Sequence, residues 1–265
     1  MESVIEQGTQ SIGRAVAVWR RIGRAAASGL SLADLAEATG LAKPTLRRML
    51  VALIREGLVE QDQHSRRYYP GPETYVTGML AAPRFGLTRI VQPALIRLAR
   101  ASGDSCFLTV RRGLHSVCLL REEGSYPVRT HALQPGDEHP LGIGAGSLAL
   151  LAALPDEEID VTLAQLAPLL AVPRYAAYDA ARLRADIAAA RVQGYALNPG
   201  LIVAGSWGIG VPIRHPLGHV AGALSLAAID QRLRPERQAE MAALLRAEAG
   251  RIEAELDEFL LRRKA

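Results

Sequence analysis

The residues best suited to chemistry in this chain form a short cationic cluster between positions 43 and 48. Lys43, Arg47 and Arg48 carry fixed positive charge, and Thr45 adds a hydroxyl group. Ammonium and guanidinium groups bind phosphate, and arginine and threonine also contact base edges in the major groove of DNA. The residue types therefore indicate recognition of double-stranded DNA.

The segment from Ser31 to Leu50 must position this cluster, and its pattern predicts two short helices joined by a tight turn at Gly40. Ser31 is expected to cap the first helix, with Asp34 as the acid of a capping box. Pro44 suits the first turn of the second helix, where its missing N–H is not needed. The second helix places its apolar residues on one face: Leu46, Met49, Leu50 and Leu53. A helix with this docking face and N-terminal cations suits a major groove.

A preceding helix is expected over about residues 11–27, and Gly29 is expected to end it. Its residues at helical spacing should form the inner stripe of a small core: Ile12, Ala15, Val16, Trp19 and Ile22. This helix completes a three-helix unit.

A β-hairpin is expected after Gly57, which should end the third helix. Val59 and Tyr68 belong to two short strand-like runs around a polar tip. Arg66 and Arg67 lie on the return run, from which a wing can reach phosphates or a minor groove. The order of helices, turn and hairpin is that of a winged helix. The alternative is a three-helix domain that has no DNA-binding role and whose arginines are simply solvated.

The composition limits the function classes without selecting one. The chain has 265 residues, enough for two domains, and a net charge of +4 that mildly favours a polyanionic partner. Cys106 and Cys118 lie in apolar runs without a CxxC pair, so we expect buried thiols and no metal site. No signal peptide is evident, and no apolar run approaches the roughly 20 residues that span a membrane. We expect a cytoplasmic protein with no membrane partner.

The rest of the chain predicts an α+β domain with helices packed mainly on one side of a sheet. A connector with a short linker helix is expected over residues 72–85. The expected strands cover residues 105–111, 115–121, 128–133, 207–214 and 220–227. The expected helices cover residues 87–101, 147–154, 156–170, 179–193 and 233–262.

A glycine-rich loop, Pro140-Leu-Gly-Ile-Gly-Ala-Gly-Ser147, is the most suggestive ligand site in this second part. Alternating glycines let a ligand approach the backbone, and the helix that follows offers unpaired N–H groups at its N-terminus. This arrangement would hold a carboxylate. Its glycine spacing does not match a dinucleotide-binding loop. A loop packed tightly under a sheet is the equally simple alternative.

Several strings along nearly the full length have a distinctive order and spacing. They are Ser31-Leu-Ala-Asp-Leu-Ala, Pro44-Thr-Leu-Arg-Arg-Met-Leu, Gly57-Leu-Val-Glu, Arg67-Tyr-Tyr-Pro-Gly, Gly136-Asp-Glu-His-Pro-Leu, Arg191-Val-Gln-Gly-Tyr-Ala, Gly208-Ile-Gly-Val-Pro-Ile and Gly218-His-Val-Ala-Gly-Ala-Leu-Ser. On these strings the chain resembles the IclR-type family of bacterial transcriptional regulators. The resemblance implies a winged helix-turn-helix over 1–71, a linker over 72–86 and a GAF-like effector-binding domain over 87–265. It also implies a homodimer or homotetramer and a small carboxylate effector, with no cofactor.

The resemblance carries a set of effector-binding residues onto this sequence. They are Gly144 and Ala145 on the glycine loop, Asn198, Gly208, Ser225 and Ala227. This chain departs from the family pattern, because Gly142 replaces the usual histidine after Pro-Leu and Ser147-Leu148 replaces the usual Gly-Lys. An acidic residue common near Asn198 is also absent. A pocket with fewer charges suggests a bulkier acid, such as an aromatic one.

Taken together, the sequence predicts an effector-controlled regulator of a catabolic operon. Two alternatives stay open. The first is an esterase-like enzyme, since Ala204-Gly-Ser206-Trp-Gly208 is one residue short of a G-x-S-x-G elbow, although strand-like sequence follows it. His215 and His219 are four residues apart, but Pro216 and Gly218 break any helix that would align them for a metal. The second is a ligand-independent architectural DNA-binding protein, which the large second domain disfavours.

Overall fold

The computed structural model describes residues 2–25, 28–85, 87–128 and 133–264. The chain divides into two compact units, Met1–Phe85 and Gly86–Ala265. The segment predicted as a linker groups with the first unit. The units are described separately below.

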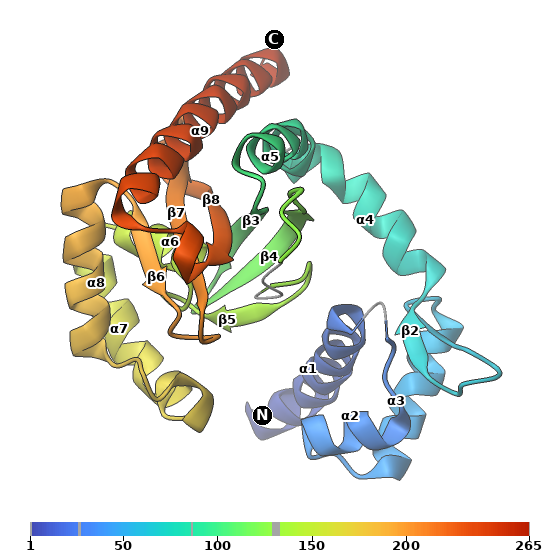
Figure 1. Ribbon diagram of the computed structural model, residues 1–265. Helices are drawn as coiled ribbons and strands as arrows, with labels where there is room; N and C mark the ends of the chain where they lie inside the picture. Colours follow the sequence, from blue (N-terminus) through green and yellow to red (C-terminus); the bar gives the residue numbers. More distant parts are fainter. Residues whose placement is uncertain (1, 26–27, 86, 129–132, 265) are drawn as a thin grey trace. The chain divides into compact units, whose positions relative to one another are not determined.

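The first unit is a winged helix-turn-helix followed by one further helix (Figure 1). Its elements are α1 (Glu2–Arg24), α2 (Leu32–Thr39), α3 (Lys43–Arg55), β1 (Val59–Gln61), β2 (Tyr68–Pro70) and α4 (Pro72–Phe85). β1 and β2 pair antiparallel, and Leu30 adds a bridge to Tyr68 on the other side of β2. The order predicted for a winged helix is confirmed.

Local hydrogen bonds explain why α2 and α3 begin and end where they do. The Asp34 N–H donates to Ser31 Oγ at 3.1 Å, and the Ser31 N–H donates to Asp34 Oδ2 at 2.9 Å, which completes the predicted capping box. Gly40 ends α2 with φ of +66°, a conformation that favours glycine. Pro44 lies in the first turn of α3, as predicted.

The core of the first unit corrects part of the predicted stripe of α1. Ala15, Val16 and Trp19 are half-buried, as a stripe toward the core requires. Val18 and Ile22 are buried, whereas Ile12 is 65% exposed. Val18 joins one apolar cluster with residues of α2, α3 and β2, so the buried side includes a residue outside the predicted stripe. Trp19 is half-buried and its Nε1–H donates to Thr74 Oγ1 at 3.0 Å, which joins α1 to α4.

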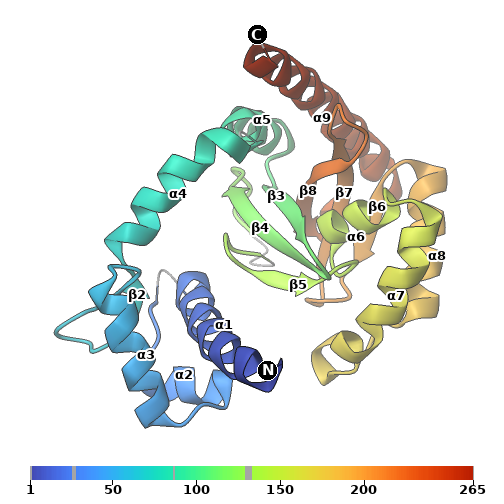
Figure 2. The ribbon, with the colours of Figure 1, turned by 180° about the vertical axis from the view of Figure 1, so that it is seen from behind.

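The second unit is built on a six-stranded antiparallel sheet in the order β5-β4-β3-β8-β7-β6 (Figures 1 and 2). The strands are β3 (Ser105–Arg112), β4 (His115–Glu122), β5 (Glu138–Pro140), β6 (Ala196–Pro199), β7 (Ser206–Arg214) and β8 (Val220–Ile229). The helices are α5 (Leu87–Ser102), α6 (Ala145–Ala152), α7 (Asp156–Leu170), α8 (Ala180–Gln193) and α9 (Pro235–Lys264). Short 3-10 turns occupy Pro173–Tyr175 and Asp230–Arg232.

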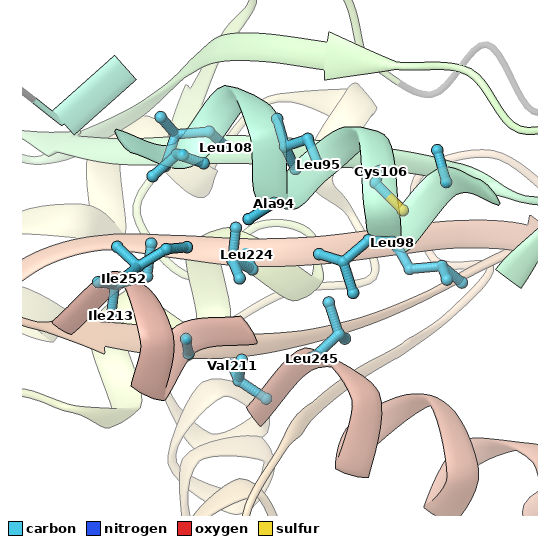
Figure 3. Packing of buried hydrophobic residues seen from close by; sticks show 14 of the residues in the cluster. Ala94, Leu95, Leu98, Cys106, Leu108, Val211, Ile213, Leu224, Leu245 and Ile252 are labelled. Atoms are coloured by element: carbon cyan, nitrogen blue, oxygen red, sulfur yellow. The ribbon is translucent and has the colours of Figure 1, made fainter. Parts of the chain in front are cut away.

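Helices cover both faces of this sheet, so the prediction of helices mainly on one side is wrong. α5 and α9 pack on one face, as Figure 3 shows for Leu98 and Leu245 around Leu224. α6, α7 and α8 form a second apolar cluster that includes Ala196 and Ala223 of the sheet. β7 and β8 put large side chains such as Val211 and Leu224 toward α5 and α9, and small residues such as Gly210 and Ala223 toward α6. A prediction based on the large apolar residues therefore finds only one buried face of the sheet.

Two edge strands escaped prediction because they are short and end in proline, which cannot donate a ladder hydrogen bond. They are β5 (Glu138–Pro140) and β6 (Ala196–Pro199). Most of the predicted strand 128–133 lies outside the described residues. Helix α6 begins at Ala145 rather than at Ser147.

Small residues allow the first turn of α6 to lie directly on the sheet. A Cβ atom at Gly210 of β7 would be 2.7 Å from the Ala145 carbonyl oxygen. A Cβ atom at Gly146 would be 3.0 Å from both Thr109 Oγ1 and Ser225 Oγ. These positions accept no larger residue without displacing the helix from the sheet.

We therefore predict that Gly210→Ala destabilises the second unit by about 1–3 kcal/mol, since the added methyl group must displace backbone. Gly250→Ala in α9 is the matched control, because nothing lies within 4 Å of its Cβ position. That change should raise stability by up to about 1 kcal/mol through helix propensity. Urea unfolding followed by circular dichroism measures both. Equal midpoints for Gly210→Ala and the unmodified chain would contradict the close approach.

Candidate functional site

Helix α3 presents a cationic surface on the side away from its buried residues. Lys43, Arg47 and Arg48 are exposed and Thr45 is half-buried. On the opposite face, Leu46, Leu50 and Leu53 are buried in the core. The helix is thus anchored by one face and offers the other to a polyanion.

One apolar side chain on this surface was missed by the sequence reasoning. Val51 is 67% exposed and lies one turn beyond Arg47 and Arg48. The sequence did contain a signal for it, because this β-branched residue lies outside the apolar stripe that was predicted to face the core. Such a side chain can contact the methyl group of thymine.

The two arginines of the wing occupy different environments. Arg66 is exposed at the tip and has a φ of +57°, which is uncommon for a residue other than glycine. Arg67 instead donates from Nε to the Ser28 carbonyl at 2.8 Å and from Nη2 to the Gly29 carbonyl at 3.2 Å. Its Nη2 also pairs with Asp34 Oδ2 at 3.1 Å. These contacts give Arg67 a part in positioning the wing, which the sequence did not predict.

The six residues predicted to bind an effector surround one cavity in the second unit. About 480 Å³ of space, including its opening, lies outside the protein atoms. Gly144, Ala145, Asn198, Gly208, Ser225 and Ala227 line it. Further lining residues were not predicted: Phe107, Leu133, His139, Ile143, Gly146, Ile202, Val203, Ser206, Trp207 and Leu226. The register of β3 with β8, which pairs Phe107 with Ser225, places that ring beside the predicted residues.

The polar groups of Asn198 are engaged within the protein. Its Nδ2–H donates to Tyr178 Oη at 2.8 Å, and its Oδ1 accepts from the Leu201 N–H at 3.1 Å. Tyr178 Oη also accepts the backbone N–H of Gly144, and burial raises the pKa of Tyr178 to about 12. Asn198 therefore joins β6 to the glycine loop and shapes the wall of the cavity.

His139 is the buried titratable group of the cavity. Its Nδ1 lies 3.0 Å from Tyr175 Oη. Burial and the charge of Arg174 lower the pKa of His139 to about 4, so the ring is neutral at pH 7. Among the described lining residues there is no Asp, Glu, Lys or Arg. The cavity is thus largely apolar, with neutral polar groups.

The glycine loop ends on the first turn of α6. Gly144 is the N-cap residue with φ of +86°, and the Gly142 N–H donates to Ser147 Oγ at 2.8 Å. The first N–H groups of a helix lack partners inside it, and the helix dipole favours negative charge at this end. The loop packs against the sheet and its residues also line the cavity, so the packed-loop alternative is met and ligand binding at the loop stays a prediction.

Other candidate chemistry receives less support. Ser206 opens strand β7, so no helix follows it as a nucleophile elbow requires. His215 and His219 stack with ring centroids 4.1 Å apart beside the turn between β7 and β8. Within the described ranges, no three His, Cys, Asp or Glu side chains are arranged to hold a metal ion. Cys106 and Cys118 are buried free thiols, and burial raises the pKa of each to about 12.

No helix in the described part of the chain is long and apolar enough to cross a membrane.

Comparison with known proteins gives consistent matches along the chain. The model of the IclR helix-turn-helix domain matches residues 11–63, and that of the bacterial transcriptional regulator IclR C-terminal domain matches residues 79–254. The HTH-type transcriptional regulator Rv1719 of Mycobacterium tuberculosis is 32% identical over 93% of this chain and 92% of its own length. The HTH-type transcriptional regulator KipR of Bacillus subtilis is 28% identical over 78% of this chain and 82% of its own length.

Solved structures show the same fold. The crystal structure of an IclR transcriptional regulator from Alicyclobacillus acidocaldarius has a TM-score of 0.77 at 23% identity and covers 93% of this chain and 98% of its own. The relatives and the matching models are transcriptional regulators, so the esterase-like alternative is set aside.

The buried His139 predicts a pH dependence of stability. Its folded-state pKa of about 4 lies below the ordinary value of 6.5. The unfolded chain therefore binds this proton more readily, and stability present above pH 6.5 is lost as the pH falls toward 4. The full effect of this one group is about 3 kcal/mol. Thermal unfolding of His139→Gln should show a smaller decrease in midpoint between pH 7 and pH 4.5 than the unmodified chain.

His64→Gln, which changes an exposed histidine of the wing, is the control for this measurement. It should retain the full decrease. An unchanged pH dependence in His139→Gln would mean that other groups account for the acid sensitivity.

Proposed function

The chain belongs to the IclR family of bacterial transcriptional regulators, and from this premise we propose that a small organic acid bound in the second unit controls its binding to operator DNA. The observation that carries the proposal is the single cavity shared by Gly144, Ala145, Asn198, Gly208, Ser225 and Ala227. The cavity combines an apolar body with the N-terminal turn of a helix. That combination suits a ligand with an apolar part and one carboxylate.

For DNA, we propose that α3 enters the major groove and that the wing contacts the backbone. Lys43, Thr45, Arg47 and Arg48 lie at the N-terminal half of α3, where side chains of a docked helix reach base edges. Arg47 and Arg48 point about 100° apart on the helix, so one reads a base and the other holds phosphate. Arg66 is exposed for a phosphate contact, whereas Arg67 positions the wing through its internal hydrogen bonds.

For the effector, we propose an acid bulkier than glyoxylate or pyruvate, with an aromatic or branched apolar group. Phe107, Ile143 and Trp207 supply apolar surface to the cavity. Without a charged side chain among its described lining residues, the carboxylate must rely on the α6 N-terminus and hydroxyl groups such as Ser225. Acids of this kind are common substrates of degradation, which supports control of a catabolic operon.

We also propose that the chain acts in the cytoplasm as a homodimer or homotetramer on a roughly palindromic operator. An exposed apolar row on α4 supports a contact between copies. Its members follow helical spacing: Tyr75, Val76, Met79 and Leu80. For regulation to be allosteric, the effector must favour one arrangement of the DNA-binding units, and operator DNA must change effector affinity by the same factor.

The DNA part is tested by fluorescence anisotropy with labelled DNA from upstream of the chain's own gene and with a scrambled duplex. Arg47→Ala should weaken operator binding by about 1–3 kcal/mol if the side chain contacts a base through two hydrogen bonds. Binding to the scrambled duplex should change much less. An equal loss on both duplexes would assign Arg47 to a phosphate. No binding of the unmodified chain to either duplex at low salt would overturn the DNA-binding role.

The effector part is tested by calorimetry with a panel of aromatic, branched and small keto acids. Ala227→Leu should abolish binding of the acid that the unmodified chain prefers, since the larger side chain fills the cavity. Ala188→Leu on the exposed side of α8 is the matched control and should bind as before. A preference for glyoxylate or pyruvate would contradict the proposed ligand class. Unchanged binding to Ala227→Leu would place the site elsewhere.

A further inference from the structure

Helix α1 carries a second cationic surface that the proposed DNA contacts do not use. Arg14, Arg20 and Arg21 are exposed, and Arg24 is half-buried beside them. No acidic residue occurs in the sequence between Glu6 and Asp34. The helix therefore carries a run of arginines with no acidic residue near them in the sequence.

These arginines line a groove between α1 and the turn that joins α2 to α3. Its other wall includes Thr39, Gly40 and Leu41. About 1010 Å³ of space, including the open side, lies outside the protein atoms. The groove thus has a wall of guanidinium groups and a wall of small or uncharged residues.

The groove continues the proposed DNA surface of α3. Leu41 is followed within two residues by Lys43, the first residue of α3. The α2–α3 turn therefore separates two cationic surfaces of one compact unit. A DNA backbone that passes the N-terminus of α3 beside this turn would meet the arginines that line the groove.

The charge on α1 costs stability unless an anion offsets it. Arg20 and Arg21 are neighbours in the sequence, and like charges held close together repel. Within the described part of the chain, no carboxylate forms an ion pair with Arg14, Arg20 or Arg21. A row of cations kept without acidic partners fits a surface that is neutralised by a ligand.

We infer that Arg14, Arg20 and Arg21 of α1 form a phosphate-binding surface for the DNA backbone, beside the α2–α3 turn. This inference rests on the proposed DNA-binding role and extends it to α1, which the contacts proposed for α3 and the wing do not include. Contacts of this kind add affinity without sequence preference. They also release counterions, so they increase the dependence of binding on salt.

The test compares the full-length chain with the triple variant Arg14→Gln, Arg20→Gln, Arg21→Gln. Anisotropy with the upstream and scrambled duplexes over a salt series gives affinity and the slope of log K against log salt. The slope should become shallower by about 0.9 for each arginine that contacts a phosphate. Affinity should fall by a similar factor on both duplexes, which leaves their ratio unchanged. Circular dichroism and thermal unfolding of the variant verify that α1 is intact.

Arg100→Gln on α5 is the control, because it removes one exposed cation from the second unit. It should leave the slope unchanged. If the triple variant keeps the slope and affinity of the unmodified chain, the inference is wrong while the DNA-binding role stands. A loss confined to the upstream duplex would also overturn it, since base reading would then replace phosphate contact. If the unmodified chain binds neither duplex, both the inference and the proposed function fail.

Discussion

The close approach of α6 to the sheet is the constraint on which the second unit depends. Gly208 and Gly210 of β7 have no side chain to separate the helix from the strand. Ala145 and Gly146, at the start of α6, are correspondingly small. Because the first turn lies so close, Ala145 and Gly146 can line the cavity, while α6 shares a second apolar cluster with α7 and α8. Larger residues on these strands would lift the helix and remove both the cavity and the second buried face.

The DNA-binding unit depends in a similar way on one network of short contacts. Asp34 accepts the Ser31 N–H as part of the capping box, and the same carboxylate pairs with Arg67 of the wing. The two hydrogen bonds between Leu30 and Tyr68 hold the same loop against β2. The start of α2 and the return of the wing are thus fixed by shared groups. Hydrogen bonding to Ser31 lowers the pKa of Asp34, so the carboxylate stays ionised for Arg67 at neutral pH.

Local signals made the helix-turn-helix predictable, because each boundary has its own residue type, as at Ser31, Gly40 and Pro44. The buried side of α1 was predicted in part, since Ile22 is buried, but Ile12 is exposed and the buried Val18 lies outside the predicted stripe. Helices on both sheet faces were also missed, because the face toward α6 is built from small residues rather than large ones. The six predicted cavity residues came from family resemblance. Phe107 and Trp207 required the strand register, which brings together segments about 100 residues apart.

The make-up of the cavity bears on how a bound acid would act. Its wall includes the glycine loop, and Asn198 and Tyr178 connect that loop to β6 and to the segment before α8. A carboxylate at the start of α6 would add a charge to a site whose described lining carries none, so most of its stabilisation must come from oriented N–H groups. A hydrogen bond from such an N–H group forms only at short range and in one direction. The ligand would therefore be sensitive to small shifts of α6 against the sheet, and by linkage it would oppose them. On the proposed function, a bound acid would thus favour the packing of α6 on β7 and β8 that directs these N–H groups at its carboxylate.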